Sequence, residues 1–142
     1  MIRFFDTSAL AKRYVTEPGS QLVRTTLRAH PVSVARITYA ELAASVARAW
    51  RGGVITEAQR DAIFARLARD FAQLTIVEVR AAVITTVPGL VLRQPLRGYD
   101  AVQLATALAV QASTQQSVEF WSADGALCAA AASEGVRVIN PS

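Results

Sequence analysis

Four acidic residues of this chain stand at or just inside the starts of predicted helices: Asp6, Glu41, Asp100 and Asp124. Asp6, Glu41 and Asp124 each follow a short apolar run that predicts a strand. Helices that follow the strands of a parallel sheet begin at the same edge, so carboxylates placed there can converge. Converging carboxylates repel one another unless a cation lies between them. The pattern therefore predicts a site for a hard divalent cation, Mg²⁺ or Mn²⁺.

Each of these acids, taken singly, is explained more simply as a helix cap. Thr38 and Glu41 have the spacing of a capping box, in which the glutamate returns to the amide of the threonine. Asp100 and Asp124 stand where a negative charge favours the helix dipole. Asp100 joins the other acids only if the apolar, irregular segment from 89 to 98 returns its helix to the same edge. The metal-site interpretation therefore rests on the four acids together.

The composition restricts the classes of protein to which the chain can belong. With 142 residues and 52% hydrophobic content, we expect one compact domain, residues 1–142. No apolar run reaches the ~18 residues of a membrane helix. No basic segment followed by a long apolar run opens the chain, so we expect no signal peptide and a cytoplasmic location. One histidine and one cysteine exclude a structural zinc site.

Other phosphate chemistries are excluded by missing motifs. No glycine-rich loop ends in lysine, and no GxGxxG follows a strand, so neither a P-loop nor a dinucleotide fold is expected. An aspartyl-phosphate receiver domain needs a lysine late in the chain, and the only lysine is Lys12. The net charge of +4 permits nucleic-acid binding. Fourteen of the fifteen basic residues are arginine, which suits phosphate but is also the product of GC-rich coding.

Strands and helices alternate along the chain, which predicts an α/β fold of three layers with a mainly parallel sheet of about five strands. We expect strands at residues 2–5, 32–35, 75–79, 118–121 and 136–139. The helix opening at Thr38 is expected to bury Leu42, Val46 and Trp50 on one stripe. The alanine-rich helix from 99 to 112 is expected to bury Val102, Ala105, Leu108 and Ala109.

Four motifs together resemble a PIN domain, and specifically a VapC-type toxin of a toxin–antitoxin pair. The resemblance spans nearly the whole chain. The motifs are Phe5–Leu10, Thr38 with Glu41, Tyr99–Asp100–Ala101 leading into Gln103–Ala107, and Ser122–Ala123–Asp124 followed by Leu127. Ser122 stands where the family usually has threonine, and serine keeps the hydroxyl. The family implies a Mg²⁺-dependent endoribonuclease that a cognate antitoxin protein blocks and that usually forms a homodimer.

The resemblance also implies roles for individual residues. Asp6 and Asp100 would hold the metal, with Asp124 as a direct or water-mediated ligand. Glu41 would orient or deprotonate the attacking water. The metal would lower the pKa of that water and neutralise charge on the phosphate.

Three further residues are weaker candidates. Ser8 and Ser122 would donate hydrogen bonds to the acids or to the scissile phosphate, although helix capping explains them equally well. Arg97, together with Arg93, would steer phosphates toward an anionic pocket, unless both belong to a solvated loop. Trp50 lies at the end of its helix beside two glycines, and Phe64 lies off the core stripe of the next helix. Such bulky apolar side chains favour a protein interface or a second core face.

Two alternative functions remain open from the sequence. The first is a PIN-fold module that binds RNA or protein without catalysis, with acids that only cap helices. The second is a DNA-directed nuclease of the same fold, although such relatives usually carry more acids and longer inserted helices. Because all four acids are present in a short chain, RNA cleavage is the favoured interpretation.

Overall fold

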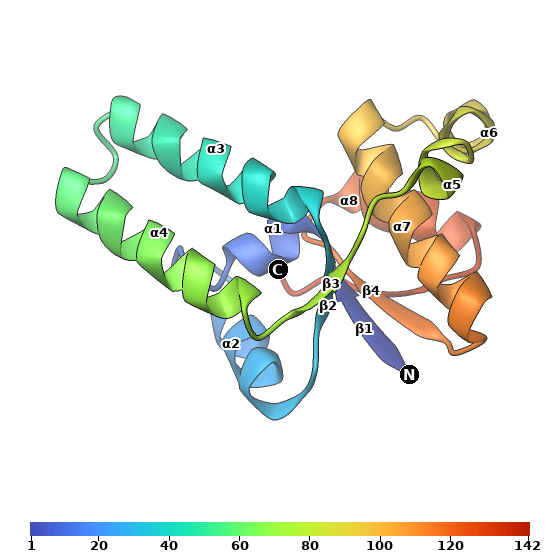
Figure 1. Ribbon diagram of the computed structural model, residues 1–142, viewed down its shortest axis with the longest axis horizontal. Helices are drawn as coiled ribbons and strands as arrows, with labels where there is room; N and C mark the ends of the chain where they lie inside the picture. The colour runs from blue at the N-terminus through green and yellow to red at the C-terminus, as the bar shows by residue number, and fades with distance from the viewer.

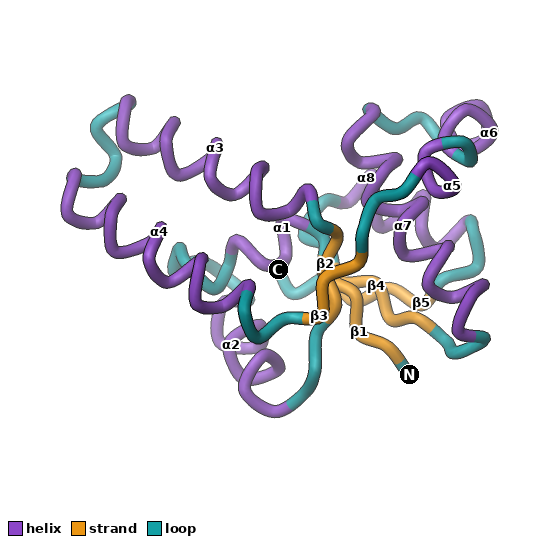
Figure 2. Tube along the Cα trace, in the orientation of Figure 1, coloured by secondary structure: helices purple, strands orange, loops and turns teal.

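The computed structural model describes residues 1–142, which form one sheet with helices on both faces. All four strand pairings are parallel, and the strand order is β3-β2-β1-β4-β5. The strands are β1 (Ile2–Phe5), β2 (Ser33–Ala35), β3 (Thr75–Val77), β4 (Val118–Trp121) and β5 (Arg137–Ile139). The prediction of an α/β fold with five parallel strands is confirmed (Figure 2).

The two central strands carry aromatic residues that alternate between the faces of the sheet. Phe4 of β1 stacks on Phe120 of β4 at 5.9 Å between ring centroids, on one face. Phe5 stacks on Trp121 at 4.7 Å, on the other face. Neighbouring residues of a strand point to opposite faces, so β1 and β4 contribute to both cores. This explains why their sequences are continuous apolar runs.

Two hydrophobic cores lie on the two faces and make the fold three-layered (Figure 1). One core packs the first half of the helices against the sheet: α1 (Thr7–Ala11), α2 (Ser20–Ala29), α3 (Ile37–Arg51) and α4 (Glu57–Phe71). The other core packs the second half: α5 (Ala81–Ile84), α6 (Val87–Arg93), α7 (Gly98–Thr114) and α8 (Gly125–Ser133).

The hairpin of α3 and α4 projects away from the sheet (Figure 1). Its second helix begins with a full capping box, because Thr56 and Gln59 exchange side-chain-to-backbone hydrogen bonds. Trp50, which we expected on the buried stripe of α3, is 39% exposed. The guanidinium of Arg60 lies over its ring at 4.4 Å, so the indole joins the ends of the two helices.

Two predictions for the second half were wrong in detail. The segment from 89 to 98 was expected to be irregular, but its first part completes α6, with Pro88 in the first turn, where proline is tolerated. The buried stripe of α7 was predicted only in part, because Ala105 is buried as expected but Val102 is only partly buried. Ala101, Leu104 and Ala107 are fully buried as well. The cause is that α7 lies between the sheet and other helices and buries more than one face. None of the helices combines the length and the apolar character needed to span a membrane.

Candidate active site

The carboxyl ends of three adjacent strands carry the polar residues of the candidate site. β1 lies between β2 and β4 in the sheet, so the residues that follow these three strands meet at one edge. Asp6 follows β1 at the centre of this edge, Ser122 and Asp124 follow β4, and α3 with Glu41 follows β2. Helix α7 leads into the parallel strand β4 and therefore has to start at this same edge, which places Asp100 there.

Asp6 is held in one orientation by its neighbours and is 3% exposed. Its Oδ1 accepts hydrogen bonds from the Ala9 amide (2.9 Å) and from Ser8 Oγ (2.8 Å). Its Oδ2 accepts a 2.7 Å hydrogen bond from Ser122 Oγ. The hydroxyl of Ser8 in turn accepts a bond from the Ala123 amide at 2.9 Å. Asp6 thus caps α1 and is also tied to the loop after β4, an arrangement that capping does not require.

The electrostatics of Asp6 are unfavourable to its charge. Burial and, to a smaller extent, the negative charge of Asp100 raise the pKa of Asp6 from 3.8 to about 6. The hydrogen bonds from Ser122, the Ala9 amide and Ser8 oppose this shift without cancelling it. No arginine or lysine pairs with Asp6. A buried carboxylate without a cationic partner is a candidate ligand for a metal ion.

Glu41 is held through one of its two carboxylate oxygens. Oε1 accepts hydrogen bonds from Thr7 Oγ1 (2.7 Å) and from Gln103 Nε2 (2.9 Å). The same Gln103 nitrogen lies 2.8 Å from Thr38 Oγ1 and 3.1 Å from Thr7 Oγ1. Glu41 Oε2 makes no hydrogen bond within the protein. The capping box expected between Thr38 and Glu41 is not formed, because α3 begins at Ile37 and both side chains belong to this network.

Gln103 is a site residue that the sequence reasoning missed. It is 2% exposed, and its Oε1 is the single buried side-chain polar atom without a hydrogen-bond partner. Its position three residues after Asp100, inside an alanine-rich helix, was the available signal. Residues three apart on a helix share a face, so α7 presents Asp100 and Gln103 to the same edge of the sheet.

Asp100 and Asp124 differ in what holds them. Asp124 caps α8 by accepting a hydrogen bond from the Leu127 amide at 3.0 Å, so the capping interpretation is correct for Asp124. Asp100 makes no capping bond. Burial raises the pKa of Asp100, as do the negative charges of Asp124 and Glu41, whereas the positive charge of Arg97 lowers it. Arg93 is engaged elsewhere, because its Nη2 lies 2.7 Å from Glu134 Oε1.

The structure brings the four predicted acids to one edge but leaves them apart from one another. No three histidine, cysteine, aspartate or glutamate side chains lie close enough together to hold one metal ion. Asp100 nonetheless links them electrostatically, because its charge raises the pKa of Asp6 and the charges of Asp124 and Glu41 raise its own pKa.

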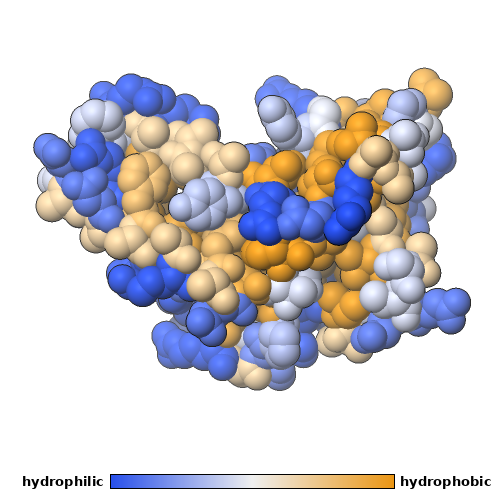
Figure 3. Space-filling view, viewed as in Figure 1, coloured by the Kyte–Doolittle hydropathy of each residue, from blue (hydrophilic) through white to orange (hydrophobic).

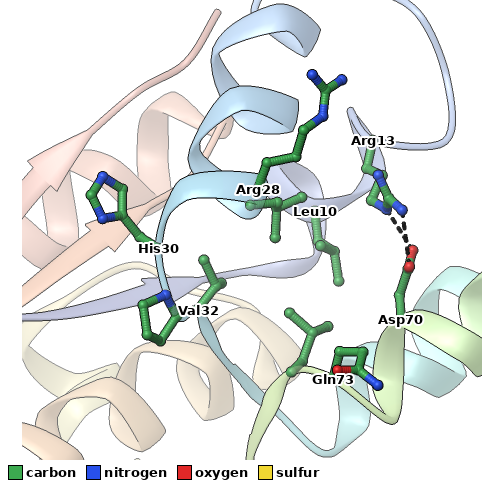
Figure 4. Close-up of a pocket in the computed structure, with 10 residues that line it drawn as sticks. Leu10, Arg13, Arg28, His30, Val32, Asp70 and Gln73 are labelled. Carbon is green, nitrogen blue, oxygen red and sulfur yellow. Dashed lines mark hydrogen bonds and ion pairs between the residues drawn. The ribbon is translucent and has the colours of Figure 1, made fainter.

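A second polar cluster lines a pocket on the side of α1, α2 and α4 (Figure 4). Its carboxylate, Asp70, accepts hydrogen bonds from Arg13 Nη2 (2.9 Å) and from the Tyr14 hydroxyl (2.7 Å). His30 and Leu74, which precede β2 and β3, also line this pocket. It therefore lies toward the opposite edge of the sheet from the acids, and its carboxylate is already paired.

Comparisons with known proteins agree with this arrangement. A sequence model of the PIN domain family matches residues 3–132. Ribonuclease VapC45 and Ribonuclease VapC49, from two strains of Mycobacterium tuberculosis, are each 36% identical over 112 residues, which is 75% of this chain and 75% of each relative.

Solved structures share the fold at low sequence identity. VapBC2 from Rickettsia felis, bound to a DNA fragment from its promoter, superimposes with a TM-score of 0.68 at 12% identity, over 98% of both chains. VapC20 of Mycobacterium tuberculosis, a toxin that cleaves the sarcin–ricin loop, superimposes with a TM-score of 0.64 at 20% identity, over 90% of this chain and 94% of its own. The family match and the two relatives at 36% identity together show that the chain belongs to the PIN domain family, within its group of VapC-type ribonucleases.

Proposed function

We propose that this protein is a Mg²⁺- or Mn²⁺-dependent endoribonuclease and the toxin of a toxin–antitoxin pair. The observation that carries the proposal is the buried Asp6, which shares its edge with three further acids and has no cationic partner. The relatives that share 36% of their residues with the chain are named ribonucleases, which supports RNA as the substrate.

The residues present fit a divalent metal. The ligand atoms available at this edge are oxygens of carboxylates, of hydroxyls and of the Gln103 side-chain amide, the type that Mg²⁺ and Mn²⁺ prefer. A cation there would offset the burial and the repulsion that raise the pKa values of Asp6 and Asp100. Asp6 and Asp100 would hold it, with Asp124 as a direct or water-mediated ligand. Because no three of these side chains lie close enough together for one ion, they would have to move toward it as it binds. When bound, the ion would offset charge on the phosphodiester and lower the pKa of the attacking water.

The chain's own residues supply the remaining functions of the site. Thr7 and Gln103 hold Glu41 Oε1, so the other oxygen, Oε2, is free to accept a proton from the attacking water. Ser8 and Ser122 fix Asp6 so that its carboxylate cannot rotate away. Arg97 adds positive charge beside Asp100, where a phosphate would otherwise meet only acids.

An antitoxin and a second copy of the chain are the proposed protein partners. An apolar groove between α1 and the α3–α4 hairpin is lined by residues that include Tyr14, Leu42, Val46 and Ile63. Among proteins of the same fold, the complex from Klebsiella pneumoniae is a toxin–antitoxin complex. An antitoxin on the hairpin could place a basic side chain among the acids. Light scattering at micromolar concentration tests the homodimer, and a monomer would contradict it.

The test of the function is cleavage of a mixed RNA pool with Mg²⁺, with Mn²⁺ and with EDTA. We expect cleavage with either ion and none with EDTA. Single-stranded DNA of the same sequences separates the ribonuclease from a DNA-directed enzyme. Equal cleavage in EDTA, with Asp6→Asn protein prepared in parallel to expose contaminating nuclease, would refute the metal mechanism.

A further inference from the structure

A cavity of about 490 Å³ opens beside Glu41, between α3 and the first residues of α7. Figure 3 shows the corresponding notch in the molecular outline, between the α3–α4 hairpin and the upper end of α7. Thr7 and Glu41 line the end of the cavity next to the acids, Tyr99 lines it from α7, and Arg48 lines it from α3. Its volume falls within the range of roughly 300–1,000 Å³ that is usual for sites of small ligands. The cavity therefore joins the acidic edge to an aromatic ring and a cation.

Tyr99 lies at the start of α7, with its ring at the surface between this cavity and an apolar hollow beside Ile84, Val87 and Pro88. It is 70% exposed, although it lies directly before Asp100 in the chain. It makes no hydrogen bond and no aromatic contact. Tyr39, by contrast, is also exposed but packs edge-on against Phe71 at 5.0 Å. An exposed aromatic ring beside a catalytic edge is suited to stacking on a base of single-stranded nucleic acid.

Arg48 supplies an unpaired cation at a defined distance from the acids. Its Nη2 donates a 3.0 Å hydrogen bond to Ser45 Oγ, and no carboxylate pairs with it. On α3 it lies two turns beyond Glu41, which is about 10 Å along the helix axis. A phosphate bound by Arg48 would therefore belong to a neighbouring nucleotide and not to the bond that is cut.

We propose that this cavity is the subsite for the nucleotide next to the cleaved bond of a single-stranded RNA. Tyr99 stacks on its base, and Arg48 binds the phosphate on its far side. Stacking on an aromatic face does not distinguish one base from another, so the subsite selects unpaired RNA and not a sequence. The subsite rests on the proposed ribonuclease function, because the acids define which bond is cut.

The subsite is tested first by binding without turnover. A short, fluorescently labelled single-stranded RNA is titrated in EDTA, and its anisotropy is followed. Tyr99→Ala should weaken binding by about tenfold, near the lower limit for base stacking, and Tyr99→Phe should restore it. Arg48→Gln should weaken binding and reduce the slope of log K against log salt by about 0.7, as expected for one phosphate contact to a single strand. Arg69→Gln, an exposed arginine on α4 outside the cavity, is the matched control and should leave the slope unchanged.

The sharper test couples Tyr99 to one position of the RNA. A set of RNAs, each with one abasic residue, is bound to the wild type and to Tyr99→Ala. The loss of binding affinity caused by Tyr99→Ala should vanish for the RNA that is abasic at one position and persist for the RNAs that are abasic elsewhere. An equal loss at every position, or none at all, would overturn the subsite.

The outcomes also separate this proposal from the proposed function. RNA that binds through Tyr99 but is not cleaved with Mg²⁺ would refute the ribonuclease. Cleavage that survives Tyr99→Ala and Arg48→Gln unchanged would refute the subsite and leave the ribonuclease standing. If both variants bind RNA normally but escape inhibition by an antitoxin, the cavity belongs to a protein partner and the subsite is refuted.

Discussion

Two carboxylate clusters of this protein have opposite electrostatics. Asp70 lies among donors, because Arg13 and the hydroxyl of Tyr14 both bond to it. Burial alone would raise the pKa of Asp70, but these hydrogen bonds and the charge of Arg13 lower it. Asp6 has hydroxyl and amide donors only, and burial together with the charge of Asp100 raises its pKa to about 6.

The difference separates a cluster that stabilises the fold from one that destabilises it. The pair of Arg13 and Asp70 joins the turn after α1 to the end of α4 and needs nothing from outside the chain. The acids near Asp6 raise the free energy of the folded protein unless a cation is bound. Evolved sites often carry such a local cost where a ligand has to bind. The same substitution, aspartate to asparagine, should therefore have opposite consequences in the two clusters.

The largest expected effect is on catalysis. Asp6→Asn should lower the rate of RNA cleavage at least ~100-fold, because a lost ligand removes charge stabilisation of several kcal/mol. Asp70→Asn removes the same charge from the other cluster and should leave the rate per folded molecule unchanged. Initial rates with saturating Mg²⁺ measure both. Equal losses in the two variants would show that Asp6 acts through stability alone.

The next effect is on the stability contributed by the paired cluster. Asp70→Asn should lower the free energy of unfolding by about 2 kcal/mol, since hydrogen bonds to a charged group are lost and Arg13 keeps an unpaired charge. The side chains of Arg13 and Asp70 are only 28% and 18% exposed, so screening by water is limited. Urea denaturation measures the change. The same measurement on Arg13→Gln and on the double variant gives the coupling energy between the two side chains. Additive effects would contradict a direct interaction.

The contrast also explains which parts of the site the sequence could predict. Strand β1 is a short apolar run that ends at Asp6, and its parallel neighbours place Asp124 and Glu41 at the same edge by topology alone. Alternation of strands and helices is visible in the sequence, so the fold and the edge were predictable. The role of Glu41 was not predictable, because the spacing of Thr38 and Glu41 along the chain is the same in a capping box and in a side-chain network.

Gln103 shows a second limit of sequence reasoning. Its helix was predicted, but the buried stripe was assigned from apolar residues, and a buried glutamine lies outside that pattern. Only the packing of α7 between the sheet and its neighbouring helices shows that this face is buried. Likewise, the exposure of Trp50 depends on how far the α3–α4 hairpin projects, which is a tertiary property.

A third effect concerns the pH dependence of the metal-free protein. Because the pKa of Asp6 is raised from 3.8 to about 6 on folding, its protonation stabilises the fold at low pH. That stability is fully present below about pH 3.8, is lost as the pH rises toward about 6, and does not change further above it.

The asparagine side chain of the Asp6→Asn variant cannot ionise, so the variant should not lose this stability as the pH rises. In EDTA the variant should match the wild type near pH 4 and exceed it by roughly 1–2 kcal/mol at neutral pH, less than the full shift because asparagine offers fewer acceptors. Urea denaturation at a series of pH values measures the difference. A wild type that is the more stable protein at neutral pH would contradict the raised pKa.

The smallest effect tests whether Asp100 shares the site of Asp6. Burial and the charges of Asp124 and Glu41 raise the pKa of Asp100, so in EDTA Asp100→Asn should stabilise the protein at neutral pH. Because Asp100 is partly exposed and water screens its charge, the gain should be below about 1 kcal/mol. The variant should also lose most of the stabilisation that millimolar Mg²⁺ gives the wild type, because binding to the folded state is its source. If Asp100 served only the helix dipole, its loss would cost a few tenths of a kcal/mol, and Mg²⁺ would have no effect.

Thermal melts of the two proteins, with and without Mg²⁺, distinguish these cases for Asp100. Arg97→Gln is a matched control, because it removes the positive charge that lowers the pKa of Asp100 and should shift stability in the opposite direction. The Arg97 variant should keep the Mg²⁺ response, since arginine is not a ligand. An Asp100→Asn protein that is less stable than the wild type in EDTA, with an unchanged Mg²⁺ response, would refute the shared acidic site. In that case Asp6 alone, and not a group of acids, would differ electrostatically from Asp70.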